Sequence, residues 1–255
     1  MPNRLVLEIC VESVNHAVAA DHGGADRIEL CTDLASGGIT PSAELMQTVR
    51  RQVRIPIHVL IRPRAGDFCY SDSELEIMRN DIRAAQQLGM DGVVLGILQK
   101  NGRVDVERTK ALVKLAHPLP VTFHRAFDAS HNLETSLEEV IQTGACRILT
   151  SAGQPRATDG LSTLARLVRA ARERILIMPC GGINSDNVVH IVTTTLAQEV
   201  HSSAGTSSPN SPGNGSDLSD GNNEVGSGLQ AELFEQKVAK LVSLLGDLSH
   251  DEHVR

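Results

Sequence analysis

The chain has 255 residues and a formal net charge of −7, from 24 basic and 31 acidic side chains. About 250 residues form one α/β barrel, and a hydrophobic content of 41% is enough to fill one core, so we expect a single domain. The acidic balance argues against nucleic acid as a partner, because binding it requires a basic patch. Nineteen of the 24 basic residues are arginine, which suits bidentate contacts with small carboxylates or phosphates.

Cysteine usage and hydropathy indicate a reduced, cytoplasmic setting without membrane contact. No apolar run approaches the roughly 18 to 20 residues of a membrane span, and the N-terminus lacks a signal-peptide cleavage pattern. The cysteines are odd in number and widely dispersed, which fits free thiols better than a disulfide framework. They are Cys10, Cys31, Cys69, Cys146 and Cys180.

Short β-rich apolar runs alternate with amphipathic stretches along the chain, as is typical of successive βα units. The predicted strands are residues 5–10, 27–31, 55–61, 92–96, 121–125, 147–151, 175–179 and 197–202. After the third strand, a capping box from Ser73 to Glu76 predicts the start of a helix, and Gly89 predicts its end.

This alternation predicts a (β/α)₈ TIM barrel. A doubly wound sheet is the main rival, but it favours a Gly-x-Gly-x-x-Gly turn after the first strand, where residues 11–13 read Val-Glu-Ser. We assign residues 1–204 to the eight barrel units. Residues 205–228, rich in Ser, Gly and Asn, are predicted to be a disordered insertion. Residues 229–255 are then the closing helix and tail, with an apolar face of Leu233, Val238, Leu241, Leu244 and Leu245.

Polar side chains are concentrated near the ends of the predicted strands, where barrel enzymes build their sites. Because alternate residues of a strand share one face, the repeated Glu-x-Cys of the first two strands places equivalent side chains together. The candidate acid and base groups are Glu8, Glu29, His58 and His124. For the two histidines, the alternative is an ordinary core histidine that donates to a carbonyl group.

A second group of residues is suited to binding an anion. Arg62 and Arg64 follow the third strand, and Arg125 follows the fifth. Gly181 and Gly182 follow the seventh strand, and His201 begins a segment that ends the eighth, where many barrels hold phosphate on backbone N–H groups. The alternatives are solvated surface charges and a tight turn that requires glycine.

Four of the cysteines, all except Cys146, lie near the same end of the predicted barrel. Soft thiolates suit Cu(I), but no Cys-x-x-Cys spacing is present, and buried inert thiols are the alternative. A His-Glu-x-x-His zinc motif is missing as well.

Six ordered motifs together resemble the CutC family. They occupy residues 7–13, 23–31, 37–42, 62–71, 122–128 and 147–151. The resemblance implies a homo-oligomeric barrel that serves cytoplasmic copper homeostasis, with Cu(I) held by Cys10 and Cys31. Ala65 departs from the family pattern, in which a second glycine usually stands.

Two hypotheses therefore remain open, and with them the question of whether the protein is an enzyme. In the first, Cys10 and Cys31 bind Cu(I) as thiolates, with Cys69 or a histidine as a third donor. In the second, the barrel is an enzyme acting on a small anionic metabolite, phosphorylated ones included. The arginines would bind this metabolite, and the carboxylates with His124 would protonate or deprotonate it.

Overall fold

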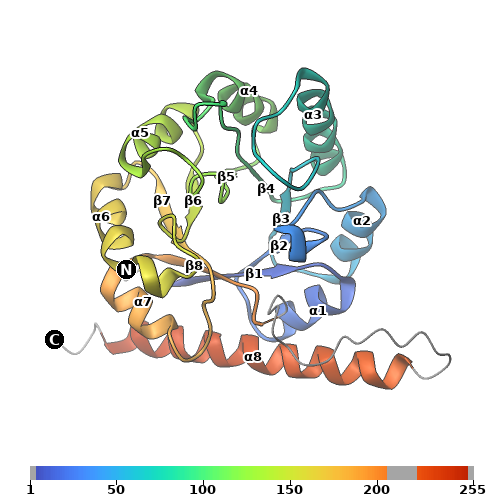
Figure 1. Ribbon diagram of the computed structural model, residues 1–255. Helices are drawn as coiled ribbons and strands as arrows, with labels where there is room; N and C mark the ends of the chain where they lie inside the picture. Colours follow the sequence, from blue (N-terminus) through green and yellow to red (C-terminus); the bar gives the residue numbers. More distant parts are fainter. Residues whose placement is uncertain (1–3, 206–222, 252–255) are drawn as a thin grey trace.

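The computed structural model describes residues 4–205 and 223–251, in which helices surround one parallel sheet (Figure 1). The strands are β1 (Val6–Val11), β2 (Arg27–Leu30), β3 (Ile57–Leu60), β4 (Gly92–Leu95), β5 (Val121–Phe123), β6 (Arg147–Thr150), β7 (Leu176–Pro179) and β8 (Glu199–Ser202). The α-helices are α1 (Val14–His22), α2 (Ala43–Gln52), α3 (Asp72–Gln87), α4 (Val106–Ala116), α5 (Leu133–Thr143), α6 (Leu161–Ala171), α7 (Val188–Thr195) and α8 (Asn223–Asp251). Two short 3₁₀ segments, Leu34–Ser36 and Ala157–Gly160, complete the list.

The strands form a nearly closed TIM barrel. The order of hydrogen-bonded neighbours runs β7-β6-β5-β4-β3-β2-β1-β8, and every recorded pair is parallel. β7 and β8 lie side by side and complete the ring. The predicted fold class is therefore confirmed, and each predicted strand end lies within two residues of the observed one.

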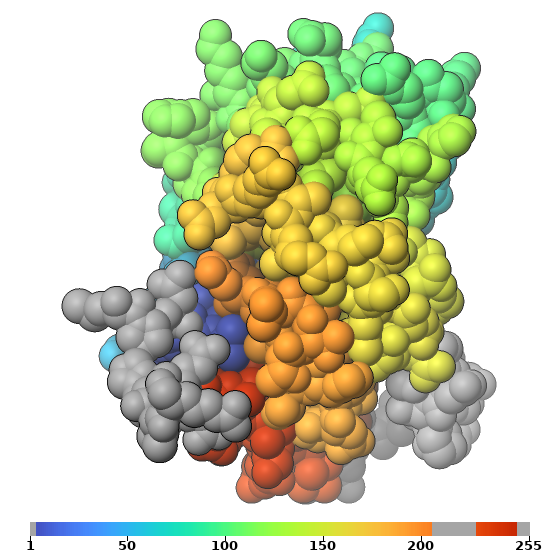
Figure 2. All heavy atoms as spheres, turned by 90° about the vertical axis from the view of Figure 1, so that its left-hand side faces the viewer, coloured from blue at the N-terminus to red at the C-terminus, as the bar shows by residue number. Residues whose placement is uncertain are grey.

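The helices cover the sheet with a continuous outer layer. Figure 2 shows this layer over α5, α6 and α7, and α8 runs across one side of the barrel in Figure 1. The apolar core lies mainly between strands and helices and includes the fully buried side chains of Ile9, Ile28 and Phe123. As in most TIM barrels, this arrangement leaves the interior of the ring for a separate set of side chains.

The capping box before α3 is not the predicted one. Ser71 accepts a hydrogen bond from Glu74 N, and the Glu74 carboxylate accepts one from Ser71 N, so the helix begins two residues earlier than Ser73 and Glu76 suggested. The sequence offers two overlapping Ser-x-x-Glu patterns, and the side chain of Arg64 contacts Glu74, which favours the first.

The closing helix also differs from the prediction. α8 begins at Asn223, so residues 223–228 of the predicted insertion are helical, while 206–222 and 252–255 lie outside the described residues. Val238, Leu241 and Leu245 are buried as expected, but Leu233 is 49% exposed and Phe234 takes its place in the core.

α8 packs closely on the end of α1, where Gly23 faces it. A Cβ atom at Gly23 would lie 2.8 Å from Val238 Cβ and 2.9 Å from the carbonyl oxygen of Glu235. Contacts this short require the helix to shift, because backbone atoms cannot rotate away.

We therefore expect Gly23→Ala to lower the free energy of unfolding by about 1–3 kcal/mol. Gly246→Ala is the matched control, because no atom lies within 4 Å of its added Cβ and the residue is inside α8. It should stabilise the protein by up to about 1 kcal/mol through helix propensity. Urea unfolding of both variants tests this, and equal effects of the same sign would contradict the packing argument.

Candidate functional site

The interior of the barrel carries polar side chains in layers that follow from strand register. Cys10 on β1 is level with Glu29 on β2, and Glu8 is level with Arg27 on one side and with His201 on the other. These side chains point inward because they alternate along their strands with core residues such as Ile9 and Ile28.

Cys10 and Cys31 lie together near the carboxyl ends of their strands, as the sequence predicted. Their sulfur atoms are 3.6 Å apart, and Cys10 Sγ lies 3.8 Å from Glu29 Oε1. Both cysteines are at most 1% exposed, beside Leu60 and Val94. The hydrogen bond with Cys31, burial and the nearby Glu29 raise the pKa of the Cys10 thiol well above its ordinary value. Without a metal, Cys10 is therefore a protonated thiol at neutral pH.

A buried ionic cluster of Glu8, Arg27, Arg147 and Glu199 lies next to the thiols, toward the amino-terminal ends of the strands. Arg27 donates to Glu8 and to Glu199, the latter at 2.7 Å, and Arg147 donates to both oxygens of Glu199. Each of the four residues is at most 7% exposed. The two positive and two negative charges neutralise one another. Buried charges are tolerated only when they are paired and hydrogen-bonded in this way. Arg27, Arg147 and Glu199 were not among the predicted site residues.

Within this cluster Glu8 is ionised at neutral pH and held by its partners. Burial alone would raise its pKa, but Arg27 and a hydrogen bond with His201 hold the pKa well below its ordinary value. His201 Nδ1 lies 2.7 Å from Glu8 Oε1. Burial lowers the pKa of His201, but this hydrogen bond together with the negative charges of Glu29 and Glu8 raises the pKa above its ordinary value. His201 was expected only as part of a phosphate-binding segment, although its position two residues after Glu199 puts both on one face of β8.

Glu29 lacks such compensation. Burial, reinforced by the negative charge of Glu8, raises its pKa to about 7 against the opposing influence of His201. Its Oε2 atom has no hydrogen-bond partner among the described residues. Together with Cys10 and His201 it forms a group whose ligand atoms lie within 4.8 Å of one another, the spacing of a metal site.

The two predicted histidines occupy space that glycines leave on β4 and just after it. A Cβ at Gly92 would lie 2.5 Å from the His58 ring, and one at Gly96 would lie 2.6 Å from His124 Nδ1. Burial lowers the pKa of His58 to about 4 and that of His124 to about 3, so both are neutral at pH 7. Of the two, only His124 lines the cavity described next.

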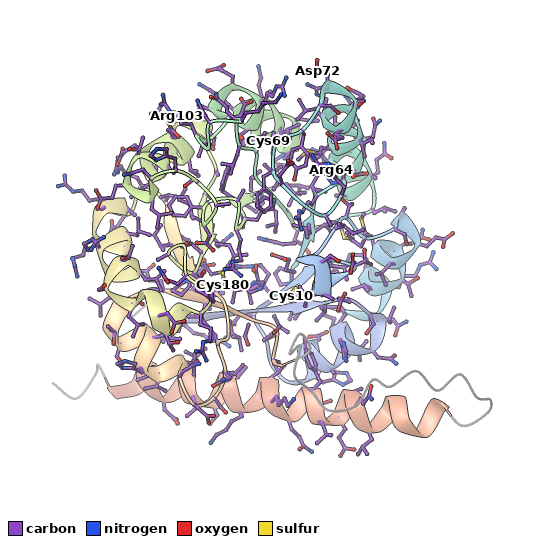
Figure 3. All side chains as sticks on the ribbon, viewed as in Figure 1. Cys10, Arg64, Cys69, Asp72, Arg103 and Cys180 are labelled. Carbon is purple, nitrogen blue, oxygen red and sulfur yellow. The ribbon has the colours of Figure 1, made fainter. Side chains whose placement is uncertain are left out.

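A cavity of about 320 Å³ lies at the carboxyl ends of the strands. Cys10, Glu29 and His201 line one part of it, and His124, Arg125, Cys180, Gly181 and Gly182 line another. Figure 3 shows Cys10 and Cys180 near the middle of the barrel, whereas Cys69 and Arg64 lie further out toward α3 and α4. Neither Cys69 nor Arg64 lines the cavity.

The three predicted anion-binding arginines have different environments. Arg62 lines the cavity but donates to the carbonyl oxygens of Ser36, Gly38 and Gly66, so it holds loops together. Arg64 contacts Glu74 and Asp67 in the loop before α3. Two of the three line the cavity and retain a nitrogen without a partner among the described residues: Arg62 through its buried Nε, and Arg125 through Nη1. Of these two, Arg125 donates mainly to side chains and Arg62 to backbone carbonyl groups.

Residues 5–206 match the model of the CutC family. The chain belongs to the CutC family. It is 48% identical over 202 residues to the copper homeostasis protein cutC homolog of Homo sapiens, an alignment that covers 79% of this chain and 74% of the relative. It is 49% identical over 205 residues to the family protein CutC of Vibrio cholerae, which covers 80% and 81% of the two chains. The predicted resemblance is confirmed.

Solved structures agree with this assignment. The CutC protein of Streptococcus agalactiae superposes with a TM-score of 0.74 at 33% identity, covering 78% of this chain and 98% of that one. Thiamine phosphate pyrophosphorylase of Pyrococcus furiosus superposes with a TM-score of 0.61 at 17% identity, covering 96% of this chain and 98% of that one. The second likeness concerns the barrel fold alone. Within residues 4–205 and 223–251, no helix is long and apolar enough to cross a membrane.

The ionic cluster should be the most sensitive part of this CutC barrel. Glu199→Gln removes the one carboxylate of the cluster that both Arg27 and Arg147 contact, leaving buried positive charge uncompensated. We expect a loss of about 3–5 kcal/mol in the free energy of unfolding. Glu138→Gln is the control, because that exposed carboxylate pairs with Arg174 in solvent and its loss should change little. Chemical denaturation of both variants measures the difference.

His124 should make the protein sensitive to acid. Its pKa is about 3 in the folded state and about 6.5 when unfolded, so the unfolded state binds the proton first as pH falls below 6.5. Stability present above pH 6.5 is then lost progressively toward pH 3. Between pH 6.5 and 5, His124→Gln should lose up to about 2 kcal/mol less than the parent protein. Equal losses in urea titrations at the two pH values would show that His124 does not contribute.

Proposed function

We propose that this CutC-family protein binds Cu(I) between Cys10 and Cys31 and serves copper homeostasis. The observation that carries the proposal is the buried pair of thiols, 3.6 Å apart, beside a cavity. Both sulfur atoms can lie about 2.3 Å, an ordinary metal–thiolate distance, from a single ion. Soft thiolate donors favour Cu(I) over the harder divalent ions. The names of the relatives in humans and other organisms support this role.

The surroundings of the thiols favour a third donor from His201 or Glu29 over one from Cys69. His201 Nδ1 is engaged by Glu8, which leaves Nε2 as the free ring nitrogen. A carboxylate that orients a histidine in this way is common behind metal sites. Because Cys10 is protonated before binding, uptake of the ion must release a proton, and affinity should increase with pH.

A reducing compartment suits this chemistry, because Cu(I) and two free thiols both require it. We therefore include a cytoplasmic location in the proposal. The homo-oligomeric assembly rests only on the family resemblance and stays a prediction. Copper is the proposed partner.

Enzyme activity on a small anionic metabolite is the second candidate. It is favoured by Glu29, whose pKa of about 7 suits a general acid or base and whose Oε2 has no partner among the described residues. Glu8 is committed to Arg27 and His201, and His58 lies outside the cavity, so neither suits proton transfer to a bound ligand.

Anaerobic Cu(I) titration against a competing chelator tests the leading proposal. Cys10→Ser/Cys31→Ser should weaken binding by more than about 100-fold, since both proposed ligands are lost. Cys146→Ser is the matched control, because Cys146 precedes β6 at the opposite end of the barrel and should bind copper like the parent. If the double variant binds as tightly as the parent protein, the thiol pair is not the copper site.

A further inference from the structure

We propose that the side of the cavity formed by β5 and β7 is a subsite for an oxyanion, the phosphate or carboxylate group of a small metabolite. His124, Arg125, Gly181 and Gly182 line this side. Its β5 wall faces Cys10 across the barrel, because β5 lies opposite β1 in a ring of eight strands, and β7 is separated from β1 by β8. The inference does not depend on the copper proposal.

The first component is the imidazole of His124. Its Nδ1 atom accepts a hydrogen bond from Ala126 N, so in the neutral ring the proton is on Nε2. Nε2 has no acceptor among the described residues, although the side chain is 5% exposed. A buried donor without a partner is costly, and an oxyanion in the cavity would satisfy it.

The second component is the guanidinium of Arg125. Nε donates to Asp128 Oδ2 at 2.8 Å, and Nη2 donates to Ser151 Oγ at 2.7 Å. These contacts fix the plane of the group and leave Nη1 without an acceptor among residues 4–205 and 223–251. Asp128 neutralises part of the charge, but its oxygens also accept from Thr150, Ser151 and Gly153, which direct the carboxylate toward the loop after β6.

The third component is the backbone at Gly181 and Gly182. Their φ angles of +93° and +67° lie in the left-handed region that glycine adopts without strain. A Cβ at Gly181 would lie 3.4 Å from Ser151 Cβ, so this turn adjoins the residue that Arg125 contacts. Among the described residues, neither N–H has a recorded acceptor. Two backbone donors beside an arginine suit an oxygen-rich anion.

The composition of the subsite selects the class of ligand. Its donors are a neutral N–H, a guanidinium and amide groups, all of which donate to oxygen. Cys180 also lines this side, but burial raises the pKa of its thiol, so it is protonated at neutral pH and is not a thiolate ligand. The cavity volume of about 320 Å³ is at the small end for ligand sites and fits a compact metabolite. The other end of such a ligand would lie toward Cys10 and Glu29.

Isothermal titration calorimetry on the metal-free, full-length protein tests the subsite, with inorganic phosphate and acetate as the two probes. We expect phosphate or acetate to bind at millimolar concentrations. The probe that binds more tightly identifies the anionic group of the ligand as a phosphate or a carboxylate. Arg125→Gln and His124→Phe should each weaken binding about tenfold, since each removes a donor to a charged group. Arg174→Gln, which removes an exposed arginine from another carboxylate pair, should bind like the parent.

The outcomes separate this inference from the copper proposal. Cys10→Ser/Cys31→Ser should keep its affinity for the anion, because the thiols lie on the other side of the cavity. No heat of binding with either probe, or unchanged affinity in folded Arg125→Gln and His124→Phe, would overturn the subsite without affecting copper binding. Circular dichroism establishes whether the variants are folded. If one of the two variants does not fold, the other still tests the subsite.

Discussion

The pairing of Arg27 and Arg147 with Glu8 and Glu199 is the interaction on which the barrel interior depends. TIM barrels usually fill this space with layers of branched apolar side chains. Here two guanidinium groups and two carboxylates occupy it, with every partner contributed by another strand. Removing charges from water costs several kcal/mol per ion, so the cluster is tolerable only because the charges are paired and hydrogen-bonded. The four residues therefore constrain one another's positions and the register of β1, β2, β6 and β8.

The arginines of the cluster neutralise the charge of Glu8 but do not contact Glu29, and this difference determines the chemistry of the cavity. Glu8 has Arg27 and His201 as partners and stays ionised. Glu29, one layer nearer the strand ends, has neither an arginine contact nor a second hydrogen bond within the part of the chain that the structure describes. The charges of Arg27 and Arg147 are thus neutralised by Glu8 and Glu199, on the amino-terminal side of the thiols along the strands. As a result, Cys10 contacts the Glu29 carboxyl group and the Cys31 thiol and not an arginine, and it remains protonated until an ion replaces the proton. A thiol in such surroundings is a poor nucleophile, which favours metal binding over covalent catalysis.

Local sequence patterns were sufficient for the barrel and for the inward position of Cys10 and Cys31. Both follow from the two-residue period of strands and the alternation of strands with helices. The ion pairs could not be predicted this way, because Arg27 and Glu199 are 172 positions apart and only closure of the ring brings them together. The arginines illustrate the same limit. Arg62, Arg64 and Arg125 look alike in sequence. In the structure, Arg62 donates to carbonyl groups of nearby loops, whereas Arg64 donates to carboxylates. The start of α3 was misplaced because two serines compete for one cap, and a contact from Arg64 decides between them.

Gly92 and Gly96 supply no side chains to the interior, yet they determine what fits there. Each gives up the volume of a side chain to a histidine ring from a neighbouring strand. In a saturation mutagenesis screen, both positions should therefore tolerate as little variation as the cysteines, although neither residue offers an atom to a metal or an anion. Intolerance to substitution in this barrel will report on space as well as on ligation, and a map of sensitive positions will have to be corrected for these two glycines before it is used to locate ligands.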